Sequence, residues 1–163
     1  MSSLVRLVEE GLLVRLDPAL GPGVLEVRRL YMLPRVIRQI EERVRGTASD
    51  RHLETEPEAQ MDGLLADFCE GIELDTGTQF KCLRPVAEGV WELKTSDLRL
   101  FGWFHARDCF IWCAVAAKWK LLETPGLVFG YVREAARIRE ELFGQDAQFV
   151  RGESPDDVIS NWC

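Results

Sequence analysis

The chain has 163 residues, of which 47% are hydrophobic, and a formal net charge of -7. This length is sufficient for one compact domain whose core needs neither metals nor disulfides. No apolar run reaches the roughly 18 to 20 residues that cross a bilayer, so we expect no contact with a membrane. The net negative charge argues against a nucleic-acid partner, because phosphate binding depends on lysine and arginine.

Cysteine and histidine usage excludes several site types. The five cysteines are an odd number and contain no C-x-x-C pair, which favours reduced thiols and a cytoplasmic location. The two histidines, His52 and His105, lie far apart in the sequence and have no H-E-x-x-H motif around them, so we predict no metal site. No glycine-rich phosphate loop precedes a helix, and we predict no cofactor.

The distribution of charge is more informative than its sum. Residues 26–46 hold six arginines against three glutamates, and residues 79–120 hold seven basic against four acidic residues, so each stretch carries +3. Residues 50–76 hold nine acids and one arginine, and residues 140–163 hold six acids and one arginine. The sequence is consistent with a basic groove on a body with acidic insertions, or with a solvated surface of mixed charge.

The residue pattern in the first half of the chain predicts two helices after a candidate strand and a turn. Residues 4–16 are a candidate opening strand, and the Pro- and Gly-rich stretch 17–23 is a turn. Apolar residues at steps of three and four predict a helix over about 26–45, in which Pro34 either kinks the helix or begins a shorter one. A second amphipathic helix is predicted over about 57–70.

From residue 79 the apolar period changes to that of strands. The runs "FKCLR", "GVWELK", "LRLFGWFH" and "DCFIWCAVAAK" are separated by short polar segments, which predicts four antiparallel strands over 79–118. The last run is apolar on both faces, so it should be a central strand. A closing helix is predicted over about 126–142. The tryptophans at 91, 103, 112 and 119 are expected in the core.

These elements predict an α+β domain over residues 1–143, followed by an acidic tail over 144–163. The stretch "KCLRPVAEGVWELKTSDLRLFGWF", with the apolar strand, "ETP" and "YVREAARIREEL" that follow it, resembles the RelE/HigB-type toxins and their phage-derived relatives. The best-matching part is 79–142. The resemblance implies a RelE/ParE-like fold, in which two N-terminal helices pack on a roughly four-stranded antiparallel sheet with a C-terminal helix.

The resemblance also implies an activity. Toxins of this family cleave messenger RNA, usually on the ribosome, by attack of a ribose 2'-hydroxyl on the adjacent phosphate, and a partner antitoxin inhibits them. Lys94, Arg99, Lys118 and Lys120 stand at or near the family's basic positions and would stabilise the charged transition state. His105 is the nearby group with a pKa suited to proton transfer, unless it is an ordinary turn histidine. Three further arginines are candidates for binding the RNA: Arg35, Arg38 and Arg84.

Two function classes follow from these observations. The first is a metal-independent, toxin-like endoribonuclease in the cytoplasm, with an antitoxin, messenger RNA and the ribosome as partners. The second is a non-catalytic protein-binding module of phage or mobile-element origin. Many members of the family carry a histidine just before the lysine pair, where this chain has Ala114 or Ala116 instead, and Arg99 could simply form an ion pair with Asp97 or Glu92.

Overall fold

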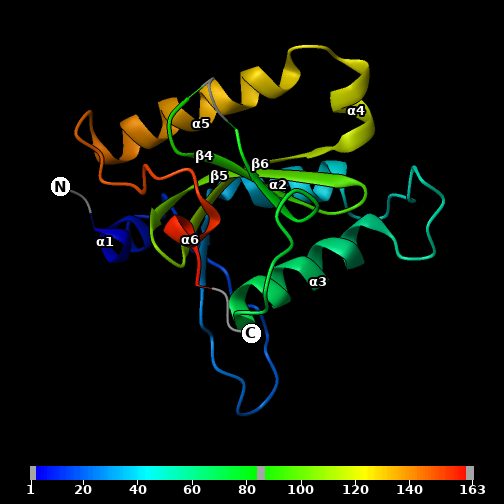
Figure 1. Cartoon of the computed structure of the whole chain (residues 1–163), viewed down its shortest axis with the longest axis horizontal. Helices are drawn as coiled ribbons and strands as arrows, with labels where there is room; N and C mark the ends of the chain where they lie inside the picture. Colours follow the sequence, from blue (N-terminus) through cyan, green and yellow to red (C-terminus); the bar gives the residue numbers. More distant parts are fainter. Residues whose placement is uncertain (1–2, 84–86, 161–163) are drawn as a thin grey trace.

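A computed structural model describes residues 3–83 and 87–160 of the chain. Within these residues six strands form a single mixed sheet in the order β1-β2-β6-β5-β4-β3, and six helices surround it (Figure 1). The strands are β1 (Val14–Arg15), β2 (Arg29–Met32), β3 (Phe80–Cys82), β4 (Val90–Lys94), β5 (Leu98–Ala106) and β6 (Cys109–Ala117). The helices are α1 (Leu4–Glu9), α2 (Pro34–Arg43), α3 (Pro57–Glu70), α4 (Lys118–Glu123), α5 (Leu127–Phe143) and α6 (Pro155–Val158).

The core lies on both faces of the sheet, as Figure 1 shows with α5 on one side and α3 on the other. On the α5 side, Phe101 stacks on Tyr131 with 4.9 Å between ring centroids, and Trp103 meets Phe143 edge-on. On the α3 side, Phe68 packs against Phe104 and Phe110 of β5 and β6. The two-sided burial explains why the run that forms β6 is apolar throughout.

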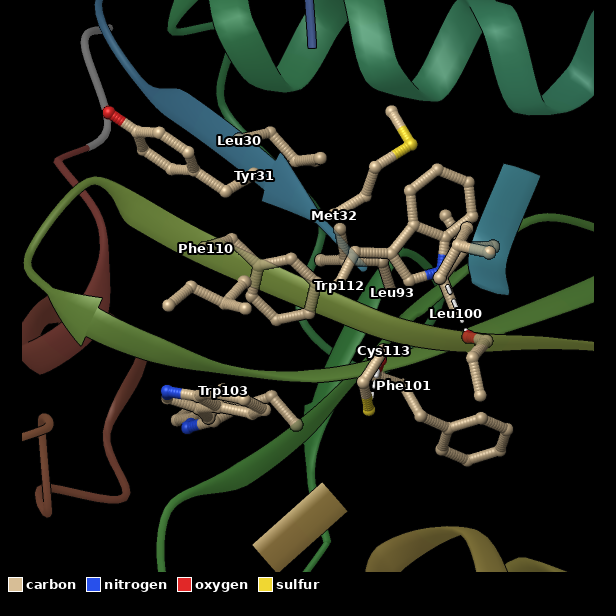
Figure 2. Packing of buried hydrophobic residues seen from close by; sticks show 14 of the residues in the cluster. Leu30, Tyr31, Met32, Leu93, Leu100, Phe101, Trp103, Phe110, Trp112 and Cys113 are labelled. Carbon is tan, nitrogen blue, oxygen red and sulfur yellow. Dashed lines mark hydrogen bonds between the residues drawn. The ribbon is translucent and has the colours of Figure 1, made fainter. Parts of the chain in front are cut away.

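The aromatic residues around β6 fill the centre of this core. Figure 2 shows Phe110 and Trp112 of β6 beside Leu30 and Met32 of β2, and the Trp112 indole N–H donates to the carbonyl of Ala114. Trp91, Trp103 and Trp112 are at most 1% exposed, as the sequence predicted. Trp119 is 44% exposed, so the expectation that it belongs to the core is wrong. It lies in α4 and not in a strand, because the helix begins at Lys118.

The predicted fold, a RelE/ParE-like four-stranded antiparallel sheet behind two N-terminal helices, is wrong. The strands β3 to β6 do pair as consecutive antiparallel neighbours, but β2 extends the sheet by pairing in parallel with β6. The strand β1 then pairs antiparallel with β2 at the edge. The sheet is therefore six-stranded and mixed. The candidate strand over 4–16 is wrong in its first part, which forms the short helix α1, and only Val14–Arg15 of this range form a strand.

Pro34 marks the boundary between β2 and α2. Of the two alternatives for the predicted helix over 26–45, a kink at Pro34 or a shorter helix that begins there, the structure has the second, because the missing N–H and fixed φ of proline suit the first helical position. The strand formed by the residues before Pro34 was not predicted. The residue before a proline favours an extended backbone, so the chain upstream of Pro34 is free to form a strand. Leu30, Tyr31 and Met32 then lie buried beside β6.

The helix α2 completes the edge of β6 beyond the end of β2. The side-chain oxygen of Gln39 accepts from the backbone N–H of Val115 at 2.9 Å, and Arg43 donates to the Val115 carbonyl at 2.9 Å. These contacts satisfy backbone groups that a neighbouring strand would otherwise pair. The second half of β6 is thereby held in place next to the site described below.

The segment expected to be an acidic tail packs on the domain as far as it is described. Val158 and Ile159 are fully buried, and the backbone N–H of Val150 donates to the carbonyl of Phe104. The buried Arg28 guanidinium donates to the carbonyls of Phe68 and Ser160, which joins α3 to this segment. The buried residues Val158 and Ile159, together with the buried Arg28, thus attach this mostly acidic segment to the rest of the domain.

Candidate functional site

An open cavity of about 800 Å³ lies at the end of the sheet where β4 turns into β5. Its walls come from α3, from the loop before β3, from the β4–β5 turn and from the first residue of α4. Among the described residues, its charged lining side chains are four cations and one carboxylate: Arg51, Lys94, Arg99, Lys118 and Asp67. The remaining walls are mostly polar, so the cavity suits an anionic ligand, and we call it the basic cavity.

Strand register and one backbone hydrogen bond bring three of these cations together. Lys94 and Arg99 are directly opposite each other in the β4–β5 pair, on either side of the turn. The backbone N–H of Lys118 donates to the carbonyl of Asp97 in that turn at 2.8 Å. Lys94, Arg99 and Lys118 therefore converge on one cavity, although Lys118 lies far from Lys94 in the sequence.

The Arg99 side chain is held by the turn beside it. One of its terminal nitrogens donates to the carbonyls of Thr95 at 2.7 Å and Leu98 at 2.8 Å. Burial lowers the pKa of Arg99 and the nearby Glu92 carboxylate raises it, but a guanidinium stays protonated in proteins. Arg99 thus contributes a positive charge, held in position by these two hydrogen bonds, to the lining of the basic cavity.

Lys94 is a partly buried amine with a perturbed pKa. Its ammonium donates to the carbonyl of Gly77 and lies 4.0 Å from a carboxylate oxygen of Glu92. Burial lowers the pKa of Lys94, Glu92 raises it, and Arg99 and the other nearby lysines lower it again, with a net decrease. Burial also raises the pKa of Glu92, against the effect of Arg99 and the lysines. An amine with a lowered pKa can exchange a proton more readily near neutral pH than an ordinary lysine.

The basic cavity is not lined by three other predicted site residues that the structure describes, the catalytic candidate Lys120 and the RNA-binding candidates Arg35 and Arg38. Lys120 lines a smaller neighbouring cavity. Arg35 forms an ion pair of 2.6 Å with Glu134, which joins α2 to α5, and Arg38 is an exposed residue of α2. Arg84 lies outside the described residues.

His105 lies near the opposite end of β5 from Arg99. The two residues are six positions apart in this strand, which corresponds to about 20 Å of extended backbone. The His105 ring packs against Phe143 with 4.9 Å between centroids. Burial, and after it the positive charge of Arg29, lower the pKa of His105, so the folded structure disfavours the charged ring. His105 cannot serve a reaction at the basic cavity.

The placement of His105 predicts a pH dependence of stability. Because its folded-state pKa is below the ordinary value of 6.5, the unfolded chain binds more protons and the free energy of unfolding should fall as pH drops below about 6.5. His105→Phe should flatten this part of the pH profile, as measured by urea unfolding between pH 7 and pH 5. His52→Asn, at an exposed position whose left-handed backbone asparagine also adopts, is the control and should change the slope less than His105→Phe does.

Two lining residues, Arg51 and Asp67, were not predicted from the sequence. Both come from the stretch 50–76, whose composition indicated an acidic insertion. Arg51 is the one basic residue of that stretch, which is the only signal that could have drawn attention to it. Nothing in the sequence shows that α3 lies beside the β4–β5 turn, because this contact depends on the packing of α3 on the sheet.

Other site chemistries find little support among the residues that the structure describes. No group of three or more His, Cys, Asp or Glu side chains is arranged to hold a metal ion in the ranges 3–83 and 87–160. The cysteines at 69, 82, 109 and 113 are free, and burial raises the pKa of Cys113 to about 12. Such a thiol is not a nucleophile at neutral pH.

None of the described helices is both long and apolar enough to cross a lipid bilayer.

No protein-family profile, curated protein or solved structure matches this chain. The resemblance to the RelE/HigB-type toxins therefore rests on the sequence motifs, and the function has to be argued from the basic cavity.

Proposed function

We propose that the protein is a metal-independent endoribonuclease that binds a phosphodiester of RNA in the basic cavity. The observation that carries this proposal is the gathering of four cations against one carboxylate in an open cavity of an otherwise acidic protein. Phosphate groups are bound by such clusters of lysine and arginine. The sequence motifs around Gly89, Trp91 and Glu92 that resemble the toxin family support the same assignment.

Different residues of the basic cavity carry out different steps of the proposed RNA cleavage. A ribose 2'-oxygen attacks the adjacent phosphorus, the bond from phosphorus to the 5'-oxygen breaks, and the products are a 2',3'-cyclic phosphate and a 5'-hydroxyl. Asp67, as the lining carboxylate, takes the proton of the 2'-hydroxyl, and Lys94 protonates the leaving 5'-oxygen. Arg99 and Lys118 stabilise the negative charge that develops on the phosphate oxygens.

In the cell, this proposal places the protein in the cytoplasm with messenger RNA as substrate, on the ribosome or free, and with an antitoxin that covers the basic cavity. The second candidate function is a non-catalytic module on the same surface. The specific observation in its favour is the position of His105, which leaves the basic cavity without an imidazole for proton transfer.

An RNA with one modified nucleotide tests the proposal. The purified protein is incubated with short RNAs, with and without ribosomes, and the cleavage products are identified by mass. We expect products that end in a 2',3'-cyclic phosphate, and a single 2'-deoxy substitution should block cleavage at that position only. RNA that is bound but stays intact in both conditions would establish the non-catalytic module instead. Cleavage that persists at the 2'-deoxy position would rule out the proposed attack.

A further inference from the structure

A second, smaller cavity of about 270 Å³ adjoins the basic cavity. Asp50 lines the smaller cavity, and its neighbour Arg51 lines the basic cavity. In the same way, Lys118 lines the basic cavity and its neighbour Trp119 lines the smaller one. At these two places the cavities are therefore lined by adjacent residues of the chain.

A hydrogen-bonded group forms the wall between the two cavities. A carboxylate oxygen of Asp97 accepts from the Ser49 hydroxyl at 2.7 Å and from the Gln60 amide at 2.6 Å. Gln60 lines the basic cavity and Asp97 lines the smaller one. Burial raises the pKa of Asp97, but the hydrogen bonds from Ser49, Gln60 and the backbone lower it by more, so the net pKa is below the ordinary value. The oxygen that accepts from Ser49 and Gln60 is thus a structural group, whereas the other carboxylate oxygen is buried without a hydrogen-bond partner among the described residues.

The smaller cavity has an exposed aromatic wall. Trp119 is 44% exposed, whereas Trp91, Trp103 and Trp112 are buried in the core. The side chains around it include several apolar groups, among them Leu98, Ala116, Ala117 and Tyr131. Large exposed aromatic rings beside a cationic groove are typical of sites where unstacked bases of single-stranded nucleic acids bind.

Among the residues that the structure describes, the exposed charged groups that line this cavity are two carboxylates, Glu42 and Asp50, and one cation, Lys120, so acceptors outnumber the single ammonium. Neither carboxylate forms an ion pair within the described parts of the chain. Arg43 is already engaged, because it donates to the Val115 carbonyl and to the Tyr131 hydroxyl. A neutral heterocycle that carries N–H donors therefore complements this cavity better than a second phosphate does.

We propose that the smaller cavity binds the RNA base next to the phosphate held in the basic cavity, and that it prefers guanine. Trp119 stacks on the base, and a carboxylate of Glu42 or Asp50 accepts from the two adjacent N–H groups on the Watson–Crick edge of guanine. Adenine and cytosine present one amino group on that edge without an adjacent ring N–H, and uracil presents one ring N–H. The inference rests on the proposed RNA substrate, but it concerns recognition and not cleavage.

Nucleoside 3'-monophosphates separate this inference from the nuclease activity, because they carry the base and the phosphate but no cleavable bond. Binding of the four nucleotides and of inorganic phosphate is measured by calorimetry for the wild type, Trp119→Ala and Trp119→Phe. Leu122→Ala, at an exposed α4 position outside the cavity lining, is the matched control.

We expect guanosine 3'-monophosphate to bind most tightly. Trp119→Ala should weaken nucleotide binding by about 5- to 150-fold, the effect of losing one stacked base, and Trp119→Phe should restore most of it. Binding of inorganic phosphate should be the same in all variants. Asp50→Asn and Glu42→Gln together should remove the preference for guanine.

The inference is overturned if Trp119→Ala binds nucleotides as Leu122→Ala does, or if inorganic phosphate binds as tightly as the nucleotides. Failure of the proposed function gives a different result, since nucleotides would still bind through Trp119 while RNA remained uncleaved.

Discussion

Replacing Arg99 with alanine should lower the rate of RNA cleavage by about 100- to 1000-fold. One charge-stabilising donor contributes about 2.7 to 4 kcal/mol to a transition state of this kind. The hydrogen bonds to Thr95 and Leu98 fix the orientation of the guanidinium before the substrate arrives, so its charge needs no rearrangement during the reaction. Single-turnover cleavage of a short RNA measures this effect without a contribution from product release.

Because Arg99 also supports the β4–β5 turn, its removal can affect folding as well as catalysis. Arg99→Lys keeps the charge but loses the forked geometry, and should recover only part of the rate. Lys118→Ala removes a cavity cation whose ammonium forms no hydrogen bond with the described residues, and should also slow cleavage. Arg133→Ala, on the exposed side of α5, is the control and should leave the rate unchanged. Folded Arg99→Ala and Lys118→Ala proteins with the wild-type rate would contradict the assignment of the basic cavity.

Replacing Gly102 with alanine should reduce the free energy of unfolding by at least about 3 kcal/mol, the upper end of the typical cost of overpacking a core. A β-carbon at Gly102 would lie 2.1 Å from the carbonyl oxygen of Ile111 and 2.7 Å from the ring of Phe110. Both neighbours belong to β6, and the first is backbone, so the strands would have to separate. For a domain of this size, the melting temperature should fall by roughly 6 to 12 °C.

The close approach at Gly102 arises from a bulge in the β5–β6 pair. Phe101 lies opposite Ala114 and Gly102 opposite Trp112, so Cys113 is an extra residue in β6. Gly130→Ala is the control, because a β-carbon at this position of α5 meets nothing within 4 Å. That change should stabilise the protein by about 0.5 to 1 kcal/mol, as alanine does in an exposed helix. Equal stability of the two variants, measured by thermal unfolding, would show that β5 does not approach β6 as described.

The candidate site was only partly predictable. Lys94 and Arg99 could be placed together from the sequence, because a short polar turn between two strand patterns brings the residues on either side of it into register. Lys118 was expected at a strand end but begins the helix α4, and the hydrogen bond of its N–H to Asp97 places it at the cavity. His105 has a pKa suited to proton transfer in the free amino acid, but its distance along β5 and its packing on Phe143 remove it from the site.

The sequence by itself determined the elements whose signals are local. The helix α3 has the predicted bounds, α5 differs from its prediction by one residue at each end, and the four antiparallel strands follow from alternating apolar runs and short turns. Only the tertiary structure decided that β2 pairs with β6, that Val158 and Ile159 are buried, and that Arg51 and Asp67 line the same cavity as Lys94. The apolar period of a segment and the chemistry of its turns depend on residues that are neighbours in the sequence. Contacts between distant segments depend on which apolar surfaces pack together with the best fit. No local sequence pattern specifies which surfaces those are.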